Sequence, residues 1–190
     1  MVSYDFSRVF QFLPTLSQAL PMTLSILFFT TILGSLFGGL LAWAQVGEDK
    51  TFAGLSKGYI FTLRCTPPIV FLFLVFYGLP EFLKWWLNLD INNWSKTVFV
   101  LFTMVLLFAA IIAEVFKASY QAIPKGQMEA GVSIGLTPSQ TFWRIIFPQA
   151  FQVALPNMTT AILNLMRDAA LAYTIGFVDV MGAGNLLISR

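Results

Sequence analysis

Histidine is absent from this sequence of 190 residues, and Cys65 is the single cysteine. A disulfide within the chain, a metal site built from histidine and cysteine, and a histidine general base are therefore excluded. No G-x-x-x-x-G-K-[ST] phosphate loop occurs either, so the chain carries no nucleotide site of that kind. Because nucleophiles are not clustered, the sequence also disfavours an enzyme embedded in a membrane.

Charge is scarce as well, at 11% of residues, whereas a soluble domain carries roughly 25%. Hydrophobic residues make up 57%, and phenylalanine alone occurs 20 times. These values predict a membrane protein, and the length predicts one domain over residues 1–190. The net charge of +2 gives no argument for a nucleic-acid partner or an acidic substrate.

Apolar stretches of about 20 residues are long enough to cross a bilayer. We expect the N-terminal stretch to be retained as a signal anchor, and Trp85, Trp86 and Trp94 to mark an interfacial hairpin between Glu81 and Lys96. Pro67 and Pro68 predict a kink or break in the second span, and Pro156 a break or bend in the fourth. Phe177–Arg190 reads as a loop leading to a further helix. The four expected spans are Leu24–Ala44, Tyr59–Leu79, Thr97–Ala113 and Gln149–Gly176.

Gly34 and Gly38 stand four residues apart in the first span. Small residues at this spacing let two helices approach closely. The partner is either another helix of the same chain or a second subunit.

The segment from about Gln121 to Pro148 is the longest interruption of the apolar pattern. Lys125–Ile134 is predicted to be a short helix that Gly135 ends in a left-handed conformation. Thr137, Pro138 and Gln140 predict a capping box that begins a second helix, which Pro148 would close. Helix, glycine turn and helix give a compact shape suited to docking on a partner protein.

The same segment resembles the cytoplasmic loop of ABC importer permeases. That signature is Glu-Ala-Ala, then Gly after three residues, Ile after nine more, and Leu-Pro after one. Here Glu129-Ala130-Gly131 is followed by Gly135, Ile145 and Phe147-Pro148 at the same spacing. Gly131 and Phe147 depart from the usual Ala and Leu. Ala113-Glu114 and Ile123-Pro124-Lys125-Gly126-Gln127 further resemble the polar-amino-acid branch, with Lys117 where Arg is common.

The resemblance implies an all-α type I permease bundle with a core of five spans, the last of which is absent from this sequence. It implies ATPase subunits as partners, which bind the ATP and Mg²⁺ that this chain does not. It also implies an external amino-acid-binding protein, a second permease copy or paralogue, and membrane lipid. The residues implied to dock the ATPase subunit are Gly126, Gln127, Glu129, Ala130, Gly131 and Gly135.

Arg167 and Asp168 are the most informative charges within an expected span. A charge at this depth costs roughly 2.5 to 3.5 kcal/mol on insertion scales, so such residues avoid lipid. They match the Lys-Asp of the family's Leu-Lys-Asp-Thr-Ser-Leu, with Ala169 and Ala170 in place of the hydroxyl residues. The two either meet the charges of a zwitterionic amino acid or form an ion pair within the bundle.

Three further residues are candidates for the substrate path, namely Arg64, Asn164 and Tyr173. Arg64 lies in a stretch similar to the family's Arg-Gly-Thr-Pro-Leu, and it serves either the path or an anchor at the membrane interface.

The sequence thus predicts a permease subunit of an importer for polar amino acids in the bacterial cytoplasmic (inner) membrane. The N-terminus is expected outside and the coupling segment in the cytosol; this orientation follows from the resemblance, because the lysines and arginines are nearly balanced. An ion-coupled secondary carrier and a membrane scaffold or assembly protein are the alternatives. Carriers usually show internal repeats and more spans, and a scaffold needs no Arg167 and Asp168 within a span.

Overall fold

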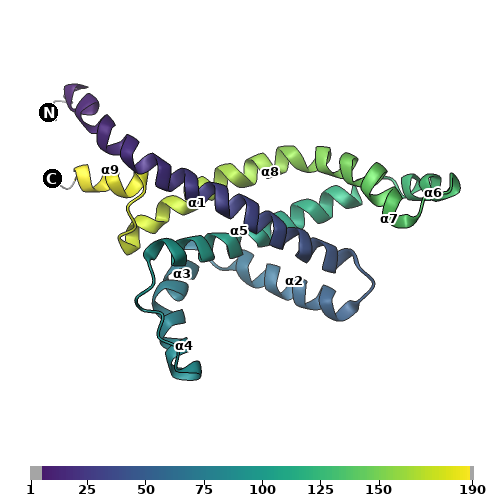
Figure 1. Ribbon diagram of the computed structural model, residues 1–190, viewed down its shortest axis with the longest axis horizontal. Coiled ribbons are helices and arrows are strands. Elements are labelled where there is room, and N and C mark those ends of the chain that lie inside the picture. The colour runs from purple at the N-terminus through teal and green to yellow at the C-terminus, as the bar shows by residue number, and fades with distance from the viewer. Residues whose placement is uncertain (1–5, 189–190) are drawn as a thin grey trace. The chain divides into compact units, whose positions relative to one another are not determined.

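The computed structural model describes residues 6–188, and these residues form helices joined by short turns, without a strand (Figure 1). The chain divides into two compact units. One combines Pro67–Met104 with the described parts of Met1–Thr30 and Leu165–Arg190, and the other combines Thr31–Thr66 with Val105–Asn164. The elements are α1 Phe6–Val46, α2 Lys50–Cys65, α3 Pro68–Phe73, η1 Leu74–Gly78, α4 Leu79–Leu87, α5 Lys96–Gln121, α6 Gly126–Ser133, α7 Pro138–Thr141, η2 Phe142–Ile146, α8 Phe147–Ala170, η3 Leu171–Ile175 and α9 Val180–Ile188.

Three helical segments among the described residues are long and apolar enough to cross a membrane: Phe12–Val46, Pro68–Leu87 and Lys96–Gln121. Pro138–Ile175 and Val180–Leu187, bent by 50° at their junction, would together form a fourth. The predicted all-α membrane fold is confirmed.

The second span lies elsewhere than predicted. Thr66 and Pro67 adopt extended conformations, so α2 ends at Cys65 and a new helix begins at Pro68. Pro68 is favourable there, since a first helical residue needs no N–H partner. The span is therefore Pro68–Leu87 rather than Tyr59–Leu79. The expected interfacial hairpin at Glu81–Lys96 is wrong in its first half, because α4 continues to Leu87.

Two π-helical turns, η1 and η2, each end two residues before a proline. The N–H of Leu79 donates to the carbonyl of Leu74, five residues back, and Pro80 follows. Phe147 donates likewise to Phe142, and Pro148 follows. A proline ring clashes with the carbonyl four residues back, and the wider turn displaces that carbonyl. The expectation that Pro148 ends the helix is therefore wrong.

The expected C-terminal loop is wrong, and of the break or bend expected near Pro156 the break does not occur. Helix α8 continues through Pro156, one of whose exposed neighbours, Thr160, donates its hydroxyl to the Pro156 carbonyl at 3.1 Å. A bend of 50° lies further along, between Ile175 and Val180. There the Asp179 carboxylate accepts the N–H of Gly182 at 2.8 Å and so caps α9, while Ser189 and Arg190 lie outside the described residues.

Helices α1 and α5 pack closely within one unit through the glycines of α1. A Cβ atom added to Gly34 would lie 2.8 Å from Cδ1 of Phe108. One added to Gly38 would lie 2.9 Å from the carbonyl oxygen of Ala109 and 3.0 Å from Cγ2 of Ile112. The glycine pair therefore serves packing within the chain, the first of the two alternatives.

Substitution of Gly38 by alanine should destabilise the protein by about 1–3 kcal/mol, because the added methyl meets backbone that cannot rotate away. Thermal unfolding of the purified protein in detergent measures the change. Gly39→Ala is the matched control, since the nearest atom to its added Cβ is Cε2 of Phe116 at 3.8 Å. Equal melting temperatures for the two variants would contradict the close α1–α5 contact.

Candidate coupling segment and substrate path

The segment between α5 and α8 folds as the sequence predicts, into helix, glycine turn and helix (Figure 1). Gly135 has a φ of 89°, its N–H donates to Val132, and that of Leu136 donates to Gly131. These are the two bonds of a Schellman motif, which satisfies the carbonyls at the end of α6. Thr137 and Gln140 form the predicted capping box at the start of α7.

Gly131 brings α6 into direct contact with α7. A Cβ at this position would lie 2.4 Å from Cγ2 and 2.7 Å from Oγ1 of Thr141. Thr141 is fully buried, and its hydroxyl donates to the Thr137 carbonyl at 3.1 Å. The family usually has Ala where this chain has Gly131. Here the side chain of Thr141 occupies the space that the methyl group of Ala would take.

The predicted docking residues lie in different environments. Gly126, Glu129, Ala130 and Gly135 are exposed, Gln127 is half-buried and Gly131 is buried. Next to them Ile134 is 76% exposed, which is unusual for an isoleucine at a helix end. Five of the six predicted docking residues therefore have surface that a partner could contact. Gly131 is buried and instead packs α6 on α7.

A polar cluster joins the end of α1 to the last turns of α5. Glu114 and Lys117, three residues apart on α5, form an ion pair with 3.7 Å between Nζ and Oε1. Gln45 bridges both residues: its amide donates to Glu114 at 3.3 Å and accepts from Lys117 at 2.8 Å. Gln45 was not predicted, because a contact across 69 to 72 residues leaves no local signal in the sequence.

One side of α7 and η2 packs on the rest of the chain. Ile146 is buried, and the ring of Phe142 lies 6.3 Å from that of Tyr120 on α5. Coupling segment and α5 are therefore held together by side-chain packing as well as by the connecting turn.

Helix α8 divides into three faces with different chemistry. One face is buried and consists of Ala154, Ala161, Leu165 and Ala169. A second is exposed and apolar, with Leu155, Leu163 and Met166. The third carries exposed polar side chains at intervals of three and four residues, which place them on one side of a helix: Asn157, Thr160, Asn164 and Arg167.

The candidate path charges are not joined to each other. Arg167 is exposed and Asp168 is half-buried, and the ion pairs among the described residues involve neither of them. Neighbouring residues on a helix point about 100° apart, which accounts for this separation. The hypothesis of an ion pair between Arg167 and Asp168 therefore has no support in the geometry.

The remaining path candidates lie at helix ends or on α8. Tyr173 is exposed in η3, in the same unit as Arg167 and Asp168. Arg64 is exposed in the last turn of α2, and it belongs with Asn164 to the other unit. In the described part of the chain, no group of three or more His, Cys, Asp or Glu side chains is placed to hold a metal ion.

Comparison with known proteins shows which family this sequence matches. Residues 34–187 match the family described as "Binding-protein-dependent transport system inner membrane component". The L-cystine transport system permease protein TcyL of Bacillus subtilis (strain 168) is 37% identical over 98% of this chain and 78% of its own length. The glutamate/aspartate import permease protein GltK of Escherichia coli O157:H7 is 29% identical over 100% of this chain and 85% of its own.

Solved structures with a similar fold are also chains of ABC transporters. A chain of an amino acid ABC transporter, solved with histidines, superposes with a TM-score of 0.84 and 26% identity over 99% of this chain and 84% of its own. A chain of the MetNI methionine ABC transporter gives a TM-score of 0.64 over 92% of this chain and 88% of its own; at 19% identity it shows the fold alone. The chain therefore belongs to the inner membrane components of binding-protein-dependent transport systems, as an ABC importer permease of the polar-amino-acid branch.

Proposed function

We propose that this chain forms part of the translocation path of an importer for polar amino acids and that α6 receives a separate ATPase subunit. The observation that carries the second part is the presentation of Glu129, Ala130 and Ile134 on a short rigid helix. Because no phosphate loop occurs in the sequence, energy from ATP has to enter through contact with another subunit. The named relatives transport amino acids, and none of the observations favours a secondary carrier or a scaffold.

The coupling segment is suited to transmit movement. Its second helix runs through η2 into α8 without a break, and its first is fixed to α7 by the contact of Gly131 with Thr141. A displacement of α6 by the ATPase subunit therefore acts on α8 through packed helices rather than through a flexible loop. Alternating access would follow as a shift between two packed arrangements.

The contacts of Gln45 support the proposed orientation. Gln45 near the end of α1 contacts Glu114 and Lys117 near the end of α5, so these two helix ends lie on one side of the membrane. Since α6 follows α5, placing α6 in the cytosol places the N-terminal end of α1 outside. This argument does not depend on counting charges.

The polar face of α8 supports its place in the translocation path. Asn157, Thr160, Asn164 and Arg167 are exposed along an otherwise apolar helix, and polar side chains within a membrane face a cavity or another protein rather than lipid. A second permease copy or a paralogue would close the path along this face. An external binding protein would deliver the amino acid, as the family name implies.

Glu129→Ala should weaken binding of the ATPase subunit about tenfold or more, since truncation of a central interface residue commonly costs roughly 2 kcal/mol. Co-purification of the two subunits and ATP-driven uptake in proteoliposomes measure the effect. Glu48→Ala is the control, because Glu48 is another exposed glutamate, just beyond the end of α1. Full binding and uptake in the Glu129 variant would refute the docking role of α6.

Gly131→Ala should reduce uptake by displacing α6 from α7, because the added methyl overlaps Cγ2 and Oγ1 of Thr141. Combining it with Thr141→Ala removes both atoms and should restore most of the uptake. Gly54→Ala is the control, as no atom lies within 4 Å of its added Cβ and Gly54 is not among the docking residues. If the double variant is no better than Gly131→Ala, the contact with Thr141 does not position α6.

Asp168→Asn should lower ATP-driven uptake about tenfold, equivalent to about 1.4 kcal/mol in the barrier, if the carboxylate meets the ammonium group of the substrate. Uptake of a panel of amino acids by the assembled transporter measures the change. Asp90→Asn is the control, since Asp90 is exposed and pairs with Lys84 at 3.6 Å. Unchanged uptake of every amino acid in the panel would reduce Asp168 to a packing residue.

A further inference from the structure

One ion pair of the described chain lies at an open surface, near the end of α4. The Lys84 ammonium is 3.6 Å from the Asp90 carboxylate, and about half of each side chain is exposed. The backbone N–H of Asn92 and, less strongly, Lys84 lower the pKa of the Asp90 carboxylate. Water screens an exposed pair of this kind, so it contributes little to stability.

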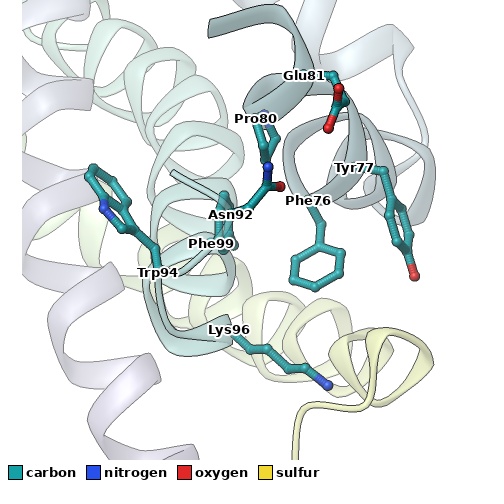
Figure 2. Close-up of a pocket in the computed structure, with 8 residues that line it drawn as sticks. All are labelled: Phe76, Tyr77, Pro80, Glu81, Asn92, Trp94, Lys96 and Phe99. Carbon is teal, nitrogen blue, oxygen red and sulfur yellow. The ribbon is translucent and has the colours of Figure 1, made fainter. Parts of the chain in front are cut away.

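A hollow of about 430 Å³ beside α4 holds two more charges, those of Glu81 and Lys96 (Figure 2). In this view the ring of Phe76 lies between the Glu81 carboxylate and the Lys96 ammonium. The ammonium donates instead to the carbonyl of Gly176 at 3.2 Å. The charges of the hollow therefore do not meet at one position.

Charged and polar side chains do converge near the end of α5. The carboxylate of Glu114 and the ammonium of Lys117 are 3.7 Å apart, and Gln45 on α1 bonds both. Only 23% of the Lys117 side chain and 36% of that of Glu114 are exposed, and Gln45 is half-buried. Partial burial weakens screening by water, so loss of a partner costs these charges more than it would at an open surface. We call these three residues the polar junction.

Gln45 suits the polar junction because its side-chain amide carries both donors and an acceptor. Its Nε2 donates to Glu114 at 3.3 Å, and its Oε1 accepts from Lys117 at 2.8 Å. A carboxylate at position 45 would offer no N–H to Glu114, and an ammonium would offer no lone pair to Lys117. A single neutral side chain therefore complements both charges.

The polar junction holds the last turns of α5. Further back on α5, the hydroxyl of Tyr59 on α2 donates to the Leu106 carbonyl at 2.9 Å, and the glycines of α1 approach α5 at Ala109. Those contacts lie several turns before the end of α5, whereas Lys117 lies about one turn before it. Gln45 therefore holds the part of α5 from which the coupling segment begins.

The same turns of α5 also contact the coupling segment. Tyr120 follows Lys117 by three residues, a spacing that places both on one side of the helix. The ring of Tyr120 lies 6.3 Å from that of Phe142 in η2. All these residues belong to one of the two units of the chain. A series of side-chain contacts therefore leads from Gln45 through α5 to η2.

The coupling segment is attached to the membrane-spanning helices at two ends, to α5 before α6 and to α8 after η2. A force on α6 acts on both attachments. If the end of α5 yields, less of the displacement reaches α8. Transmission to α8 therefore requires that the end of α5 be held, and the polar junction holds it.

We infer that Gln45 is a positioning residue for energy coupling, which fixes the last turns of α5 so that displacement of α6 moves α8. The inference rests on the proposed function, in which the ATPase subunit displaces α6 and α8 lines the path. It extends that function to the end of α1, a segment outside both the docking residues and the path residues. The quantity that Gln45 controls is the amount of amino acid transported per ATP hydrolysed.

The test measures uptake and ATP hydrolysis by the assembled importer in proteoliposomes supplied with its external binding protein. The probes are a panel of polar amino acids that includes L-glutamine, L-glutamate and L-cystine. Gln45→Glu places two carboxylates side by side without an N–H between them, so the amino acid transported per ATP should fall about fivefold or more. Co-purification of the ATPase subunit should stay unchanged, which separates a lower ratio from loss of assembly.

Exchange of the two side chains tests whether their chemistry or only their size matters. Glu and Gln have nearly the same volume, so residues that only fill space tolerate both Gln45→Glu and Glu114→Gln. Glu114→Gln alone leaves the Lys117 ammonium without a carboxylate and should lower the ratio as well. It introduces no repulsion between like charges, so it carries the test where Gln45→Glu fails to assemble. The double variant returns one carboxylate, one amide and one ammonium to the polar junction and should restore most of the wild-type ratio.

Gln18→Glu is the matched control for Gln45→Glu, since Gln18 is an exposed glutamine of the same helix. Glu48→Gln is the control for Glu114→Gln, as Glu48 is exposed beyond the end of α1. Both controls should keep the wild-type ratio. An unchanged ratio in Gln45→Glu and Glu114→Gln, or a double variant no better than the single ones, would overturn the role of Gln45. A wild-type importer that takes up no amino acid of the panel would contradict the proposed function instead.

Discussion

A chain that crosses hydrocarbon must satisfy its backbone hydrogen bonds within its own helices, and this one does so with nine prolines. Each proline that interrupts the pattern is accommodated in a particular way. Pro68 and Pro138 stand at helix starts, where no N–H is needed, and Pro80 and Pro148 follow π turns. This constraint decides where the helices break. It gives the span that runs from α3 through α4, and it keeps α7 continuous with α8.

The continuity from α7 to α8 matters most for function. Were Pro148 the end of a helix, the coupling segment would be joined to α8 by a flexible turn. The π turn η2 instead keeps the two in one helical run, since it moves the carbonyl that the proline ring would meet. At the other end of the segment, Lys117 contributes a compact ammonium with three donors, which serves both Gln45 and Glu114. An arginine at position 117 would present a planar guanidinium group in place of this compact ammonium.

Local chemistry was predictable from the sequence, and distant contacts were not. The capping box of Thr137 and Gln140 and the left-handed Gly135 depend on residues within one or two turns, and both predictions are confirmed. The bridge made by Gln45 joins residues about 70 positions apart, and no periodicity reveals it. Helix α9 was missed for another reason: Gly182 and Gly184 suggested a loop, yet Gly182 lies so close to the Phe177 carbonyl that a Cβ there would be 2.5 Å away. Close packing, rather than loop flexibility, accounts for that glycine.

Ala169 and Ala170 stand where the family's motif has two hydroxyl residues, which raises the question of whether α8 loses polar surface. The faces of α8 answer this question. Ala169 is only 4% exposed and shares the buried face with Ala161 and Leu165, so a hydroxyl there would lie among packed side chains. The exposed polar face retains Asn164 and Arg167, with Asp168 at its border. The replacement at Ala169 therefore changes how α8 fits its neighbours, whereas Ala170 is half-buried and lies outside that face.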